Sequence, residues 1–168
     1  DAGEVLTVDT SANAASETVT IIGGAANDVF TLSAIADSVD GGAGNDTFNF
    51  AEANLASTDS VTGGDGTDTL AISDTAAVTD AELTNFTSVE TISLNVAGSA
   101  AMTVALDAQA LEAGIVTVDG SAADQDVTVT VSAGYTGNLT VLANSADNSV
   151  TGGAGNDTVV SNAATNLN

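Results

Sequence analysis

Apolar residues recur along this chain with a period of nine residues. The spacing holds within three sets: Ile21, Phe30, Val39 and Phe48; Val61 and Leu70; and Val141, Val150 and Val159. A fixed period is the sequence signature of a chain wound into a coil, because each step must return to the same place in the cross-section. The pattern therefore predicts a solenoid whose interior is filled by these side chains.

The middle of the chain, residues 73–133, keeps a strand pattern but lacks the nine-residue period. Ile92, Leu94 and Val96 alternate with polar residues, and the same alternation runs through 102–106 and 127–131. Alternation with a period of two predicts strands that bury one face.

Two short segments of this region predict helical excursions between coils. In the first, 79–86, Thr79 stands three residues before Glu82, which is the spacing of a capping box. The second, 106–114, ends at Gly114, a residue suited to stop a helix.

Glycine-rich turns precede several of the periodic apolar residues. Four begin with a glycine pair: GGAAND at 23–28, GGAGND at 41–46, GGDGTD at 63–68 and GGAGND at 152–157. Asp28 and Asp46 are eighteen residues apart, or two periods, and Asp68 follows after twenty-two, which indicates a four-residue insertion near 52–57. One edge of the coil should therefore stack three glycine-rich turns, while the opposite edge carries plainer loops with Asp37 and Asp59.

The C-terminal part repeats the pattern in weaker form. GYTGNLTV at 134–141 aligns with GGAGNDTV at 152–159, eighteen residues later, and Leu139 stands where the aspartate would be. We therefore divide the chain into stacked turns (1–72), degenerate coils with short helices (73–133), and further coils (134–168) that we expect to continue in more protein. Together they predict one elongated domain.

The charge of the chain limits the kinds of binding partner that it can have. The 168 residues include no Lys, Arg, His or Cys, and the net charge is −23. Phosphate contacts need cationic side chains, so nucleic acid is excluded as a partner, and insertion into a membrane is not expected. Self-repulsion at this charge disfavours a compact state unless the carboxylates lie far apart or bind cations. A hydrophobic content of 43% argues against disorder.

The turns have the chemistry of a cation site. Paired glycines allow a tight reversal of the backbone, which aims carbonyl oxygens at one point, and the aspartate adds a carboxylate. Such hard oxygen ligands, without nitrogen or sulfur, are typical of Ca²⁺. One turn supplies about half of a shell of six to eight oxygens, so two stacked turns are needed and binding contributes to folding.

The turns resemble a known family. The pattern GGxGxDxUx, with U apolar, is the nonapeptide repeat of RTX calcium-binding proteins. The resemblance implies an all-β fold, a right-handed parallel β-roll or β-helix with Ca²⁺ in stacked glycine-rich turns. The stretch LTNFTSVETISLNV, at 83–96, is also similar to the β-strand repeats of bacterial S-layer proteins and large surface adhesins.

The resemblance also implies a ligand set. Carboxylate ligands would be Asp28, Asp46, Asp68 and Asp157. Carbonyl ligands would be Gly23, Ala25, Gly41, Ala43, Gly63, Asp65, Gly152 and Ala154, or their immediate neighbours. Three stacked turns leave two gaps, so we expect about two Ca²⁺ ions within 23–70. The turn that ends at Asp157 has no downstream partner turn in this sequence.

The other acidic residues are expected to serve solubility. Asp37, Asp59 and Asp147 are interpreted as solvated loop carboxylates, and Asp40 is left open between ligand and surface. Glu4, Glu17, Glu52 and Glu112 are interpreted as surface residues. Phe30, Phe48 and Phe50 are expected in the core.

Two functions fit, neither of them catalytic. There is no His, Lys or Cys to act as base or nucleophile, and we expect no enzyme. The first hypothesis is a calcium-stabilised structural module of a secreted Gram-negative surface protein (S-layer, matrix fibre or adhesin), exported by type I secretion and self-associating end to end or laterally. The second is an accessory β-roll that aids secretion and folding of an attached enzyme or toxin. The strand-rich middle favours the first, and the single Tyr and absence of Trp argue against a sugar-binding adhesin tip.

Overall fold

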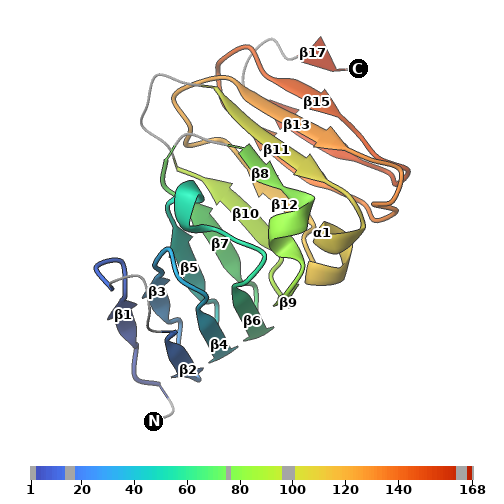
Figure 1. Ribbon diagram of the computed structural model, residues 1–168. Helices are drawn as coiled ribbons and strands as arrows, with labels where there is room; N and C mark the ends of the chain where they lie inside the picture. Colours follow the sequence, from blue (N-terminus) through green and yellow to red (C-terminus); the bar gives the residue numbers. More distant parts are fainter. Residues whose placement is uncertain (1–2, 14–17, 75–76, 96–100, 162–165, 168) are drawn as a thin grey trace.

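The chain winds into a parallel β-solenoid of about seven turns, with almost no helix (Figure 1). This computed structural model describes residues 3–13, 18–74, 77–95, 101–161 and 166–167, and Glu17 and Val96 lie outside them. The predicted all-β, parallel class is confirmed. None of the helices in the described ranges is long and apolar enough to span a membrane.

One eight-stranded sheet runs the whole length of the solenoid. Its strands, in spatial order, are β1 (Thr7–Asp9), β3 (Val29–Thr31), β5 (Thr47–Phe50), β7 (Thr69–Ile72), β10 (Thr91–Leu94), β12 (Thr117–Asp119), β14 (Thr140–Ala143) and β16 (Thr158–Ser161). This sheet passes through all three segments that the sequence distinguished.

The other wall of the solenoid is built from two shorter sheets in succession. The first contains β2 (Thr20–Gly24), β4 (Ser38–Ala43), β6 (Ser60–Asp65) and β9 (Phe86–Thr87). The second contains β8 (Ala77–Thr79), β11 (Met102–Leu106), β13 (Val127–Val131), β15 (Ser149–Thr151) and β17 (Asn166–Leu167). The change from one sheet to the other falls in the middle segment, where the glycine turns are missing from the sequence.

One apolar side chain per coil occupies the same register along the long sheet, both where the nine-residue period holds and in the middle segment where it does not. In the long sheet Phe30 pairs with Phe48, which pairs with Leu70, and the row continues through Ile92, Val118 and Val141 to Val159. Every member except the last is buried, and the two phenyl rings stack with centroids 5.3 Å apart. Burial of each such side chain contributes about 1.5–3 kcal/mol, so this row supports the coil along its whole length.

Helices form where the sequence predicted excursions. The 3-10 helix η2 (Asp80–Leu83) starts after Thr79, whose N–H donates to Glu82 Oε2 at 2.7 Å. Helix α1 (Ala108–Ala113) stops at Gly114, which has a φ of 99°. The predicted insertion near 52–57 holds a third short helix, η1 (Glu52–Asn54). Helix α1 contacts both η2 and β9, so it covers the place where the second wall changes sheets (Figure 1).

Candidate metal centre

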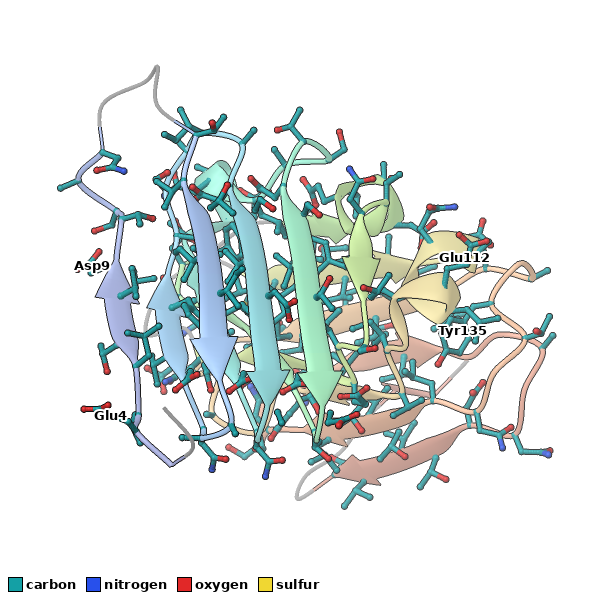
Figure 2. All side chains as sticks on the ribbon, turned by 90° about the horizontal axis from the view of Figure 1, so that it is seen from below. Glu4, Asp9, Glu112 and Tyr135 are labelled. Carbon is teal, nitrogen blue, oxygen red and sulfur yellow. The ribbon has the colours of Figure 1, made fainter. Side chains whose placement is uncertain are left out.

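The glycine-rich turns stack into one row, as predicted. Gly24, Gly42 and Gly64 occupy matching positions in β2, β4 and β6. In Figure 2 these strands lie side by side and point the same way, so the turns that follow them line up at the strand tips.

The stack needs glycine because backbone packs directly on backbone. Gly42 and Gly64 have φ values of 100° and 109°, in the left-handed region that other residues rarely adopt. A Cβ on Gly42 would clash with the Gly24 carbonyl oxygen, and a Cβ on Gly64 would clash with that of Gly42. Successive turns can therefore approach closely enough to share oxygen atoms.

Aspartate side chains join each turn to the one before it, and we call this row of hydrogen bonds the ladder. The Asp28 N–H donates to Asp46 Oδ1 at 2.7 Å, and the Asp46 N–H donates to Asp68 Oδ1 at 2.7 Å. The row starts with the Leu6 N–H, which donates to Asp28 Oδ1 at 2.7 Å. All three aspartates are buried, because the turn folds each carboxylate under its own glycine pair.

The neighbouring asparagines form a second row that runs in the opposite sense. The Asn45 N–H donates to Asn27 Oδ1 at 2.8 Å, and the Thr67 N–H donates to Asn45 Oδ1 at 3.0 Å. The turns at 41–46 and 63–68 therefore each receive a side-chain bond from both neighbours, which holds the carboxylates in register.

Two of these three aspartates have a second carboxylate oxygen without a protein partner. Asp46 Oδ2 and Asp68 Oδ2 are buried and accept no hydrogen bond, whereas Asp28 Oδ2 accepts from the Gly24 N–H at 2.9 Å. A buried charged oxygen without a partner is destabilising, so these atoms require a cation or a proton.

A backbone carbonyl from the next turn lies beside each of these oxygens. At Gly23, the position that a Cβ would take is 2.7 Å from Asp28 Oδ2 and also adjoins the Gly41 carbonyl oxygen. At Gly41, the corresponding position is 2.6 Å from the Gly63 carbonyl oxygen and adjoins Asp46 Oδ2. Carboxylate and carbonyl oxygens from successive turns thus converge where a side chain is missing, and this donor set fits a calcium ion.

The carboxylates of these candidate sites are not grouped closely enough to bind a metal by themselves. Within the described part of the chain, no three acidic side chains are placed to hold a metal together. Each candidate site instead combines acidic side chains from the ladder with main-chain carbonyls.

Burial changes the acidity of the ladder. It raises the pKa of Asp46 above its ordinary value, against the hydrogen bond from the Asp28 N–H, while the charges of Asp28 and Asp40 add to the increase. Burial likewise raises the pKa of Asp68, opposed by the bond from the Asp46 N–H and supported by the charges of Asp46 and Glu90. A bound divalent cation would favour the ionised carboxylates instead.

Some predicted carbonyl donors lie elsewhere in the turns. The Asp65 carbonyl accepts the Gly44 N–H at 2.8 Å, and its side chain is exposed. The carbonyl of Ala26, next to Ala25, faces Gly44 in the following turn. The carbonyl of Gly42, next to Ala43, faces Gly64 in the same way.

The C-terminal turn repeats half of this arrangement. Asp157 Oδ1 accepts the Leu139 N–H at 3.0 Å, and Asp157 Oδ2 lies 2.5 Å from the position that a Cβ on Gly152 would take. Ala154 is exposed and its N–H donates to the Tyr135 carbonyl. Tyr135 itself is buried, with its hydroxyl 2.5 Å from the Ile115 carbonyl (Figure 2). No later turn stacks below Asp157 among the described residues.

The opposite edge of the coil corrects one prediction. Asp37 and Asp59 were expected to be solvated, but they are 1% and 0% exposed. The Asp37 N–H donates to Asp59 Oδ1 at 3.1 Å, and both the N–H and the hydroxyl of Ser33 donate to Asp37 Oδ2. The plainer loops fold back on themselves, so their N–H groups reach three of these four carboxylate oxygens. The fourth, Asp37 Oδ1, is buried and accepts no hydrogen bond. Burial raises the pKa of Asp59.

The remaining acidic residues follow the expectations with one exception. Asp40, Asp147, Glu4 and Glu112 are exposed. Glu52 is half-buried rather than fully solvated, and its N–H donates to Asp74 Oδ1 at 2.5 Å. Burial, together with the charges of Glu82 and Asp74, raises the pKa of Glu52.

One member of the ladder was missed. The Asp68 N–H donates to Glu90 Oε2 at 2.8 Å, so Glu90 stands where the next aspartate would be. A signal was present, because Asp46, Asp68 and Glu90 are spaced by twenty-two residues and each is followed by threonine and an apolar residue. The glycine pair that marks the other turns is absent before Glu90, so the glycine motif does not identify it.

Comparison with known proteins gives one match. The family model for the RTX calcium-binding nonapeptide repeat matches in 4 copies, over residues 20–48, 56–71 and 134–166. These segments include all four double-glycine turns. No curated protein and no solved structure matches the chain.

Proposed function

We propose that this chain, whose repeats match the RTX calcium-binding nonapeptide in 4 copies, is a β-roll that serves as a calcium-stabilised structural module of a secreted bacterial surface protein. The module would belong to an S-layer, a matrix fibre or an adhesin of a Gram-negative bacterium, and would fold, and assemble with further copies, when it binds Ca²⁺.

The observation that carries this proposal is the pair of buried oxygens Asp46 Oδ2 and Asp68 Oδ2, which have no partner in the protein. Without a cation they oppose the stacking of the turns, and with one they hold neighbouring turns together. Binding then becomes part of the folding free energy, because the oxygens converge only when the coils are in register.

The first site would lie between the turns of 23–28 and 41–46, and the second between those of 41–46 and 63–68. Asp28 and Asp46 would supply the carboxylate oxygens beside these two gaps, and Gly41 and Gly63 would supply the carbonyl oxygens. Asp68, the third predicted carboxylate ligand, has its free oxygen on the side of the turn that follows 63–68. Water would complete the six to eight ligands that Ca²⁺ takes. The positions Gly23, Ala25, Ala43, Asp65, Gly152, Ala154 and Asp157 remain predicted contributors.

Rigidity and charge support the structural role. The apolar row Phe30–Val159 and the eight-stranded sheet make one continuous wall. A net charge of −23 is tolerated best where divalent cations are abundant, as outside the cell. RTX repeat proteins are typically extracellular and exported by type I secretion. Folding after export would follow from the difference in calcium between the two compartments.

A calcium titration tests the proposal. Metal-free protein is titrated with Ca²⁺ while far-UV circular dichroism and light scattering are recorded together, with Mg²⁺ as the control ion. We expect β-structure to appear with Ca²⁺ and scattering to rise with it. β-Structure without scattering would favour the accessory roll of an attached enzyme or toxin. Unchanged dichroism, with full β-structure already present in the metal-free protein, would contradict the proposal.

A further inference from the structure

We infer that the turn at Ser88–Glu90 closes a third calcium site against Asp68, at a place that no glycine motif marks. This inference rests on the proposed function, and it concerns a turn that lies outside the residues matched by the nonapeptide family model.

The hydrogen-bond ladder continues to this turn without a change in geometry. The bond from the Asp68 N–H to Glu90 Oε2 is 2.8 Å long, against 2.7 Å for both the Asp28–Asp46 and the Asp46–Asp68 bonds. Glu90 therefore occupies the same position relative to Asp68 as Asp68 occupies relative to Asp46.

The oxygen pair is repeated as well. At Gly63 the position of a Cβ is 2.5 Å from Asp68 Oδ2 and adjoins the Ser88 carbonyl oxygen. The two earlier turns place Gly41 and Gly63 carbonyls in that role. Asp68 is 0% exposed and its Oδ2 accepts no hydrogen bond, so an unpartnered charged oxygen points into this third gap.

The turn reaches this geometry with different residues. Val61 and Thr62 pair with Phe86 and Thr87, which sets Ser88 opposite Gly63. Four residues lie between Gly63 and Asp68, but only one lies between Ser88 and Glu90, and the longer glutamate side chain spans the difference. Ser88 has a φ of 52°, the left-handed conformation that glycine adopts more readily.

The location gives the site a distinct role. Strand β9 ends the sheet of β2, β4 and β6, and the Val89 N–H donates to the Ala113 carbonyl of α1 at 3.0 Å. A cation held by Asp68, Glu90 and the Ser88 carbonyl would tie the last glycine-rich turn to the central coils. It would thus couple calcium binding in the stack to the part of the chain that carries no repeat.

The test counts bound Ca²⁺ by native mass spectrometry and isothermal titration calorimetry. Glu90→Gln keeps an oxygen that can accept the Asp68 N–H but removes the charge. We expect it to bind one ion fewer than the unmodified protein and to keep its remaining affinities. Glu112→Gln, at an exposed position on α1, is the matched control and should bind the full number (Figure 2). Ser88→Gly keeps the carbonyl and should also retain every ion.

A second measurement does not depend on the fold of the Glu90 variant. Asp157→Asn removes the charge of the C-terminal turn and so isolates the N-terminal stack. Three ions in this variant support the third site, and two overturn it. An unchanged ion count and affinity in Glu90→Gln also overturn it. If the unmodified protein binds no Ca²⁺ at all, the proposed function fails together with this inference, whereas two bound ions leave that function intact.

Discussion

The backbone N–H of Asp28 donates a 2.7 Å hydrogen bond to Oδ1 of Asp46, eighteen residues further along the chain. One residue earlier, the asparagine pair bonds in the reverse sense, from the Asn45 N–H to Asn27 Oδ1 at 2.8 Å. The two bonds hold adjacent turns in register from both sides. Because the first uses only one oxygen of Asp46, the other is left facing the glycines of its own turn.

Asp46→Asn should separate the two roles of this side chain, which are to accept the Asp28 N–H and to bind a cation. The amide keeps an oxygen for the Asp28 N–H but lacks the charge that a cation needs. We expect calcium affinity to fall about tenfold or more, which corresponds to about 1.4 kcal/mol per tenfold. Calcium titration followed by circular dichroism measures the loss, and Glu4→Gln, at an exposed position, is the control. A variant that binds Ca²⁺ like the unmodified protein would contradict the assignment of Asp46.

The metal-free protein should become more stable as the pH is lowered. Asp46, Asp59 and Asp68 have raised pKa values in the folded state, so the folded protein binds more protons than the unfolded chain. Stability from these groups is present at low pH and is lost as the pH rises through their folded-state pKa values. Far-UV circular dichroism in calcium-free buffer should therefore show β-structure appearing as the pH is lowered from 7 to about 4, the ordinary aspartate range.

Saturating Ca²⁺ should reverse that trend, because protons then compete with the ion for the same carboxylates. Thermal melts in saturating Ca²⁺ should therefore show a midpoint that falls as the pH is lowered. A midpoint that rises toward low pH in Ca²⁺ would argue that the ladder carboxylates do not bind it.

Gly64→Ala should disrupt the stack more than its backbone angle alone predicts. Gly64 and Gly3 have similar positive φ values, 109° and 95°, but a Cβ on Gly3 meets no atom within 4 Å. Gly3→Ala should therefore show only the left-handed strain of about 1–2 kcal/mol. Gly64→Ala should lose at least about 2 kcal/mol more, since its Cβ displaces the Gly42 carbonyl. Urea unfolding in Ca²⁺ measures both, and equal losses would show that the turns are not closely stacked.

Asp59→Ala should weaken the fold without changing calcium binding. Its oxygens accept the Asp37 N–H at 3.1 Å and the Ala56 N–H at 2.9 Å. Each N–H left without a partner costs about 1–3 kcal/mol. The loss in the free energy of unfolding in urea should be the same at two saturating Ca²⁺ concentrations. A loss that changes with the Ca²⁺ concentration would instead place an ion at this edge.

The sequence predicted the features that depend on period and on glycine. Phe30, Phe48 and Leu70 share a register because the coil returns to the same position, and the turns stack because only glycine allows the approach. It did not predict the burial of Asp37 and Asp59, which depends on how loops without glycine fold back. It also missed Glu90, because a shorter turn and a longer side chain reach the same place by a different route.

The change of sheets opposite a continuous wall has a mechanical consequence. Hydrogen bonds between successive coils run along the long axis, so tension applied to the two ends loads them in series and peels coils one at a time. The eight-stranded wall passes the junction at β9 unbroken, whereas the other wall is interrupted there and bridged by α1. Under load, we therefore expect the solenoid to bend first at this junction, because only one of its two walls is continuous there.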